Sequence, residues 1–221
     1  MMLNTPLSRR LTLASASAFG LVWMLPAAAQ TPEAPEVLIE RLARELMDAV
    51  QKDADLRNGN MVKVNQLVDQ KLMPHVNFGR MTASAVGRFW RQATPEQRQR
   101  LQQEFKTLLV RTYAGALGQL TTQTLAMRPS RYRPEDKEVV VRSELRGRGD
   151  PIQLDYRMES TPTGWKVYDI NVMGIWLVET YRTQFAQEIT ARGIDGLITT
   201  LAQRNSSNPA SPSGNAGSAA R

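Results

Sequence analysis

The sequence predicts an α+β domain in which amphipathic helices cover one face of a curved four-stranded antiparallel sheet and enclose an apolar cavity. Apolar residues recur with a helical period in the first half of the chain and again after residue 176, whereas residues 138–172 alternate with a period of two. Helices before and after a run of strands are typical of helices gathered on one face of an antiparallel sheet. Such a sheet has one apolar face, yet several helices compete to cover it. This surplus indicates a cavity, and a solid core is the alternative.

Two amphipathic helices open the predicted domain. Apolar side chains share one face over residues 36–57 and again over residues 61–73, where Pro74 ends the pattern. These side chains are Ile39, Leu42, Ala43, Leu46 and Val50 in the first helix and Val64, Leu67, Val68 and Leu72 in the second. A shorter helix is expected before Phe89 and Trp90.

The longest predicted helix covers residues 94–120. Thr94 as the N-cap, Pro95 in the first turn and Gln97 three residues after the cap form a capping box. The apolar stripe of this helix comprises Leu101, Phe105, Leu108, Leu109, Thr112 and Ala116, and it is widened by Tyr113 and Leu117.

Four strands follow, the first near residues 122–131 and the others within residues 137–147, 151–161 and 164–172. The third alternates without a fault, with Ile152, Leu154, Tyr156 and Met158 on one face and Gln153, Asp155, Arg157 and Glu159 on the other. The segments "RGRGDP" and "TPTG" supply glycine and proline where the chain must reverse. Two helical patterns complete the domain, one through Trp176, Tyr181, Phe185 and Ile189 and one over residues 193–204.

Composition excludes several kinds of chemistry. The chain has 221 residues, 42% hydrophobic and 22% charged, which is ordinary for one globular domain. It contains no cysteine and a single histidine, His75. Disulfides, thiolate nucleophiles and cysteine metal sites are therefore excluded, and little imidazole chemistry is available. We expect neither a metal nor a cofactor.

The N-terminal segment is predicted to direct export of the protein. Residues 1–29 combine a basic start, a short apolar run and an Ala-x-Ala site, which are typical of a signal peptide and place the mature N-terminus at Gln30. Arg9 and Arg10 allow twin-arginine export as well as the Sec route. The cleavage site has no cysteine for lipid attachment, so we expect a soluble protein of the periplasm.

The other end of the chain and the net charge complete the domain organisation. Residues 205–221 contain no core-forming side chain and are predicted to be a disordered tail, leaving residues 30–204 as the folded domain. Removal of the signal peptide takes away two arginines and no acid, so the formal charge falls from +7 to +5. For an exported protein, this charge favours anionic lipid head groups or an acidic protein over nucleic acid. A basic, solvated surface without a partner is the alternative.

Several segments carry a resemblance to one family. The segments "GWKVYDINVMGI", "YRTQF" and "GIDGLITTL" resemble the C-terminal half of the MlaC family, and "FWRQATPEQRQRLQQEFKTLLVRTYAGAL" and "LMPHVNFGRMTASAVG" resemble its earlier segments. These are periplasmic phospholipid-binding proteins of the maintenance-of-lipid-asymmetry pathway, related to the toluene-tolerance proteins. The similarity covers residues 36–203, and the tail is not part of the family pattern.

The resemblance implies a carrier that holds the acyl chains of a diacyl phospholipid in a cavity between the sheet and the helices. It also implies two partners, an outer-membrane lipoprotein that sits with a porin and an inner-membrane ABC transporter complex with an MCE-domain subunit. We expect a monomer with lipid as cargo. The expected cavity wall consists of Phe105, Leu108, Tyr113, Val141, Leu154, Tyr156, Met158, Tyr168, Ile170, Val172 and Trp176.

A cavity enzyme with a carboxylate base is the alternative function. Such an enzyme needs a buried acid with a perturbed pKa, and Asp169 is the candidate. A hydrogen-bonded carboxylate at a strand end explains Asp169 equally simply. Asp155 alternates onto the polar face, and His75 follows a helix end where capping or packing is the common role. We therefore predict a binding protein and no enzyme.

Overall fold

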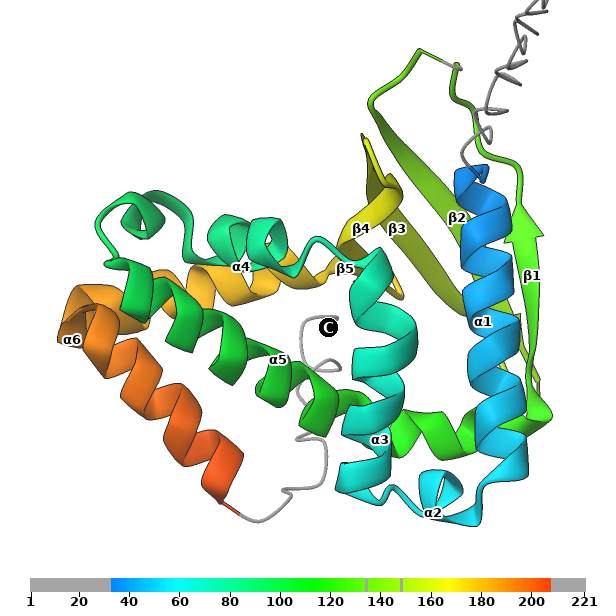
Figure 1. Ribbon diagram of the computed structural model, residues 1–221, viewed down its shortest axis with the longest axis horizontal. Helices are drawn as coiled ribbons and strands as arrows, with labels where there is room; N and C mark the ends of the chain where they lie inside the picture. The colour runs from blue at the N-terminus through cyan, green and yellow to red at the C-terminus, as the bar shows by residue number, and fades with distance from the viewer. Residues whose placement is uncertain (1–32, 134, 148, 208–221) are drawn as a thin grey trace, which may run out of the picture. The chain divides into compact units, whose positions relative to one another are not determined.

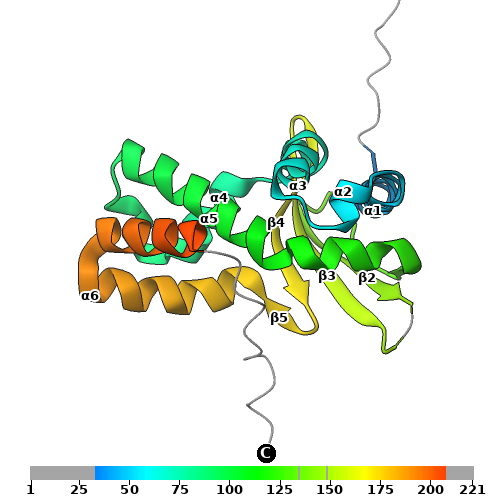
Figure 2. The same cartoon turned by 90° about the horizontal axis from the view of Figure 1, so that it is seen from below.

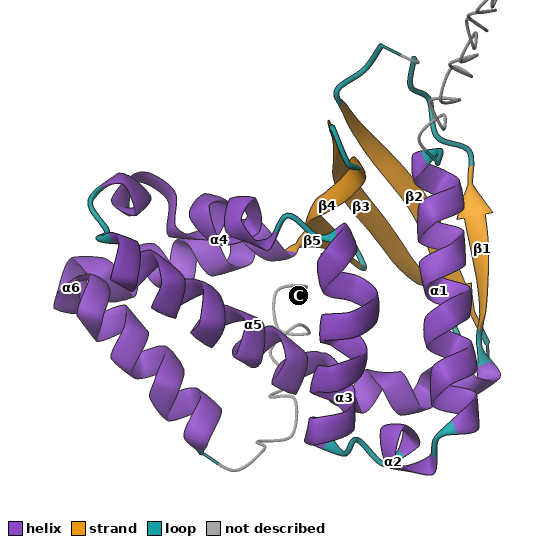
Figure 3. Cartoon of the chain, in the orientation of Figure 1, coloured by secondary structure: helices purple, strands orange, loops and turns teal. Residues whose placement is uncertain are grey.

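The computed structural model describes residues 33–133, 135–147 and 149–207. The predicted signal peptide and the tail beyond residue 207 lie outside these ranges. Helices and a single antiparallel sheet make up the described residues, which confirms the predicted α+β class (Figures 1 and 3).

The helical elements appear where the periodicity predicts them, except that the first predicted helix, residues 36–57, is divided into two helices at Asp53. The chain begins with α1 (Pro35–Lys52), α2 (Ala54–Arg57) and α3 (Met61–Leu67), which runs into the π-helical turn η1 (Val68–Leu72) and the 3-10 turn η2 (Met73–His75). These are followed by α4 (Phe78–Val86), η3 (Gly87–Arg91), α5 (Pro95–Leu117) and η4 (Gly118–Thr122), and α6 (Leu177–Ser206) comes after the strands.

Side-chain caps fix where the helices begin. The Oδ1 atoms of Asp53, Asn60 and Asn77 accept hydrogen bonds from backbone N–H groups at the starts of α2, α3 and α4. The capping box of α5 is confirmed, because Gln97 N donates to Thr94 Oγ1 at 3.2 Å and Thr94 N donates to Gln97 Oε1 at 3.0 Å.

The sheet has five strands rather than the predicted four. They are β1 (Thr124–Arg128), β2 (Glu138–Arg146), β3 (Ile152–Thr161), β4 (Gly164–Val172) and β5 (Ile175–Trp176), each antiparallel to the next in sequence order. The fifth strand pairs with the end of β4 through a two-residue turn at Met173 and Gly174, whose φ angles of 53° and 88° are both left-handed. Sequence reasoning missed β5 because its two residues read as the start of the following helix.

One face of the sheet packs under α1. Val139, Val141, Met158 and Val167 form a buried cluster with Leu38, Ile39 and Leu42 of α1, which lies over β1 and β2 in Figure 1. We call this side the inner face and the opposite side the outer face. On the inner face the strand register aligns Val141, Tyr156 and Ile170 in one row and places Leu154 opposite Val172.

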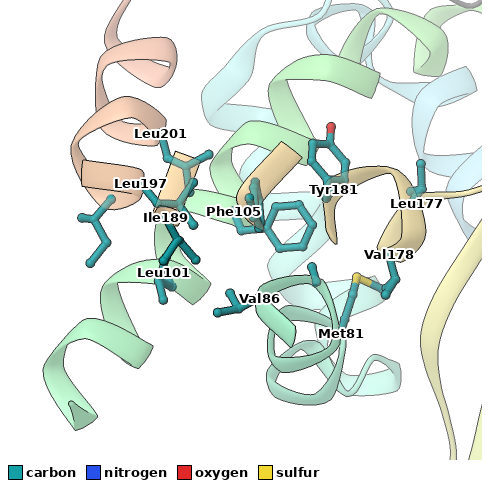
Figure 4. Close-up of a cluster of buried hydrophobic side chains, with 13 residues drawn as sticks. Met81, Val86, Leu101, Phe105, Leu177, Val178, Tyr181, Ile189, Leu197 and Leu201 are labelled. Carbon is teal, nitrogen blue, oxygen red and sulfur yellow. The ribbon is translucent and has the colours of Figure 1, made fainter. Parts of the chain in front are cut away.

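The long helix α6 is bent at Gly193. Gly193 has φ 71° and ψ −179°, a conformation that glycine adopts without the steric cost of a side chain, and the chain turns back there (Figure 2). This bend separates the two helices that the sequence predicts. Both halves pack with α4 and α5 around Phe105, whose ring lies 4.9 Å from that of Tyr181 and 5.2 Å from that of Phe185 (Figure 4).

The folded domain extends beyond the predicted boundary at residue 204. Helix α6 runs to Ser206, and Asn205 is only 9% exposed. Its Nδ2 donates to the carbonyl oxygen of Glu104 at 2.9 Å and to Glu104 Oε2 at 2.7 Å, while Arg111 Nη2 donates to Ser207 O at 3.1 Å. Helix α6 therefore continues two residues past the predicted end of the domain at residue 204.

These contacts predict that the position of a truncation matters. Cutting after Arg204 removes the Asn205 hydrogen bonds, which should cost about 1 kcal/mol of unfolding free energy, or about 2–4 °C in Tm. Cutting after Ser207 keeps them and serves as the matched control. Thermal unfolding of the two truncated proteins tests this, and equal Tm values would show that the Asn205 contacts are not stabilising.

Candidate functional site

An apolar pocket of about 260 Å³ lies between the helices and the end of the sheet. Its walls come from four parts of the chain, and it is half-open to solvent rather than enclosed. The α3–η2 wall contributes Val64, Val68, Leu72 and Met73, the sheet end and α6 contribute Ile170, Val172 and Leu177, and the link through α4 contributes Val76, Phe78 and Met81. Most of these side chains are only half-buried, so the pocket keeps apolar surface in contact with water.

Helix α5 supplies the remaining wall. Its contribution repeats at three- and four-residue spacing, as one stripe of a helix must, and comprises Lys106, Leu109, Val110, Tyr113, Ala114 and Leu117. A second apolar stripe, with Leu101 and Phe105, is fully buried against α6. The helix therefore has one apolar side in a solid core and another facing a hollow.

Lys106 is the one charged side chain among the described residues that line this pocket. Its Nζ donates to Asp69 Oδ1 of η1 at 2.8 Å. The ion pair joins α5 to η1, and both of these elements contribute side chains to the pocket wall.

A family model described as "MlaC protein" matches residues 40–203, about three quarters of the chain. The chain belongs to the MlaC family. The resemblance noted in the sequence is thereby confirmed.

Named relatives and a solved structure agree with this membership. The toluene tolerance protein Ttg2D of Pseudomonas putida is 27% identical over 78% of this chain and 79% of its own length. The intermembrane phospholipid transport system binding protein MlaC of Haemophilus influenzae is 25% identical over 79% of this chain and 83% of its own. A phospholipid-binding protein from Ralstonia solanacearum, solved in complex with a phospholipid, is 49% identical with a TM-score of 0.76, covering 78% of this chain and 97% of that one.

Three of the residues predicted for the cavity of this MlaC-family protein line the pocket, namely Tyr113, Ile170 and Val172. Phe105 and Leu108 belong instead to the core cluster between α5 and α6. Val141, Tyr156 and Met158 lie under α1 on the inner face, and Leu154 lies beside the pocket residue Val172. Their contact with lipid remains a prediction.

Two residues of the predicted cavity wall, Tyr168 and Trp176, lie on the outer face of the sheet and not on its inner face. A β-bulge between β3 and β4 leaves Tyr168 without a partner in the register, so both Tyr168 and Asp169 turn to the outer face. There the Tyr168 hydroxyl donates to Glu138 Oε2 at 2.9 Å, and the guanidinium of Arg80 lies 3.6 Å from the centre of its ring. Trp176 stacks on Arg157, 3.8 Å from its guanidinium, also on that face.

Sequence reasoning missed most of the pocket wall. The periodicity marked Val64, Val68 and Leu72 as one apolar face, but it did not show that this face lines a hollow. Met73, Val76, Phe78 and Met81 lie in turns and a short helix, where a two- or four-residue pattern carries little signal. Lys106 interrupts the apolar stripe in the sequence. It is recognised as a pocket residue only from its position beside Leu109 and Val110 in the fold.

Asp169 has a structural role. It is 1% exposed, and its Oδ1 accepts hydrogen bonds from the backbone N–H groups of Ile170 at 2.9 Å and Val178 at 3.0 Å. Its Oδ2 accepts a hydrogen bond from Arg157 Nη1 at 2.9 Å. Burial raises the pKa of Asp169, while the two N–H donors and Arg157 act in the opposite direction. Because Val178 lies in the first turn of α6, Asp169 caps that helix from the neighbouring strand.

The other titratable candidates also lie outside the pocket lining. Asp155 faces outward, and its Oδ2 accepts a hydrogen bond from Gln153 Nε2 at 2.9 Å, whereas its Oδ1 has no partner among the described residues. His75 ends η2, where burial and the positive charges of Arg41 and Lys166 lower its pKa. The described residues contain no group of three or more His, Cys, Asp or Glu that could hold a metal ion.

Proposed function

We propose that this protein is a periplasmic phospholipid carrier that holds acyl chains in the apolar pocket. The supporting observation is the Ralstonia relative, 49% identical over nearly its whole length, whose structure contains a phospholipid. The lining of the pocket in the present chain matches acyl chains in polarity, because its wall is apolar apart from Lys106 and the Tyr113 hydroxyl.

The energetics of lipid transfer explain why an apolar pocket is needed. A diacyl phospholipid has roughly thirty methylenes, and exposing each to water costs about 0.8 kcal/mol, so bare transfer costs on the order of 20 kcal/mol. A carrier lowers this cost by replacing water with apolar side chains.

None of the helices among the described residues is long and apolar enough to cross a membrane.

The pocket must widen to hold a whole diacyl lipid. Its volume of about 260 Å³ falls just below the range of about 300–1,000 Å³ that is typical of ligand sites. A space large enough for the acyl chains would form if the α3–η1 wall moved away from the sheet. Such a movement would bring Leu154 and Tyr156, next to Val172 and Ile170 in the register, within reach of the acyl chains.

The carrier would shuttle lipid between the two membranes and maintain outer-membrane lipid asymmetry. Its proposed partners are the lipoprotein with a porin and the ABC transporter complex with an MCE-domain subunit. The name of the Haemophilus influenzae relative, which places it in an intermembrane phospholipid transport system, supports this role. We propose no catalytic role, because both carboxylate oxygens of Asp169 accept hydrogen bonds from structural partners, namely Arg157 and the backbone N–H groups of Ile170 and Val178.

Lipid analysis of the purified protein tests the proposal. Native mass spectrometry of the protein purified from a periplasmic extract should show one population whose added mass matches a diacyl phospholipid. Organic extraction should release the same lipid. Protein that is recovered without lipid, and that takes up none from phospholipid vesicles, would overturn the proposed function.

A further inference from the structure

The part of α5 that lines the pocket ends at a charged side chain, Lys106, which is suited to bind a charged group of the ligand. An amphipathic ligand in an apolar pocket must put its polar head where the apolar lining ends. Along α5 the lining runs from Leu117 through Val110 and Leu109 to Lys106, and its character changes from apolar to cationic only at Lys106. Resting on the proposed function, we propose that the Lys106 ammonium binds the phosphate of the carried lipid.

The present partner of Lys106 can be exchanged at little cost. Lys106 is paired with Asp69 at 2.8 Å, and the Lys106 side chain is 27% exposed while that of Asp69 is 50% exposed. If a phosphate replaces Asp69, the partly buried ammonium keeps an anionic partner and the released carboxylate, already half in water, becomes solvated. The long, flexible lysine stem allows the ammonium to follow the new partner.

The backbone that carries Asp69 is suited to such an exchange. Asp69 lies in η1, a π-helical turn between α3 and η2, and single π-helical turns are frequent at functional sites. The same turn contributes Val68 and Leu72 to the pocket wall. The Lys106–Asp69 pair therefore acts as a clasp between two walls of the pocket, and the phosphate of an entering lipid opens it by competing for Lys106.

A competition between two lipids with identical chains tests the clasp. Lipid-free protein is incubated with vesicles containing equal amounts of dioleoyl phosphatidylcholine and dioleoylglycerol, and the ratio of the two bound lipids is measured. The ratio cancels changes in the apolar pocket, since both lipids have the same acyl chains. We expect Lys106→Met to lower the phospholipid-to-diacylglycerol ratio about tenfold, the effect of about 1.4 kcal/mol in one charged contact.

Companion variants separate the clasp from a general loss of charge. Asp69→Asn removes the competing carboxylate and should raise the ratio, while Lys106→Arg should keep it near that of the unchanged protein. The matched control is Lys63→Met on α3, because Lys63 also pairs with an aspartate, Asp53 at 3.6 Å, but does not line the pocket. Lys63→Met should leave the ratio unchanged.

Two results would overturn the inference. A ratio for Lys106→Met equal to that of the unchanged protein, with both lipids still bound, would show that Lys106 does not contact the phosphate and would leave the carrier function intact. Failure of the unchanged protein to bind either lipid would instead overturn the proposed function and this inference together.

Discussion

Replacement of Ala114 by tryptophan should empty the protein of lipid without unfolding it. Ala114 is 6% exposed and lies in the α5 wall of the pocket, so a large side chain there projects into the space proposed for acyl chains. Ala114 also belongs to a buried cluster with Val64 and Val110. The new ring must therefore extend into the pocket, and this overpacks the lipid complex more than the lipid-free protein. Overpacking costs about 1–3 kcal/mol, which corresponds to a loss of lipid affinity of about 5- to 150-fold.

The same helix offers a matched control for this substitution. Ala116 is exposed and lies two residues along α5, so Ala116→Trp adds the same side chain on the solvent side. Bound phospholipid, measured by extraction and normalised to protein, should fall sharply in Ala114→Trp and stay unchanged in Ala116→Trp. Thermal unfolding of the lipid-free proteins should show both folded. Equal lipid content in the two variants would mean that the acyl chains do not occupy this pocket.

Helices and strands could be predicted from the sequence wherever many residues repeat one period. The capping box at Thr94 fixed the start of α5, and faultless alternation over residues 152–159 fixed both faces of β3. The errors lie where one or two residues decide the geometry. The bulge at Tyr168 adds a single residue to β4 and turns Tyr168 to the outer face, and period-two counting contains no signal for it.

The pocket was harder to predict than the fold. Periodicity shows that a side chain is apolar and on one face of a helix, but not whether another element or a hollow lies opposite. On α5, Phe105 meets the rings of α6 and is fully buried, while Tyr113, two turns further on, remains 39% exposed beside the pocket. Both carry the same signal in the sequence. The prediction that the ligand is a lipid therefore came from the family resemblance and not from the periodicity.

Removal of the Asp169 carboxylate should destabilise the fold strongly. In Asp169→Ala the buried Val178 N–H loses its acceptor and Arg157 loses its ionic partner. These two losses should lower the unfolding free energy by about 2 kcal/mol, because the buried Val178 N–H is left without an acceptor, whereas Arg157, whose side chain is 38% exposed, is solvated at a smaller cost. Denaturant unfolding at neutral pH measures this change.

Another buried carboxylate on the same face of the sheet provides the control. Asp155 is 7% exposed, but it accepts a single side-chain hydrogen bond, from Gln153, and its Oδ1 has no partner among the described residues. Removing a poorly satisfied polar group is nearly neutral, so Asp155→Ala should change the unfolding free energy by less than about 1 kcal/mol. Equal costs for the two variants would attribute the effect to burial of any carboxylate and not to the cap of α6.

The pH dependence of the Asp169 effect follows from the sign of its pKa shift. Burial raises the pKa of Asp169 above its ordinary value of 3.8. At a pH between 3.8 and this raised pKa, the folded protein therefore binds a proton that the unfolded chain has released. In that window the contribution of Asp169 to stability falls as the pH rises. The stability difference between the unchanged protein and Asp169→Ala should therefore be largest below pH 3.8 and should narrow as the pH rises through the raised pKa. A difference that widens over this range would show that the Arg157 pair and the two N–H donors outweigh burial and lower the pKa.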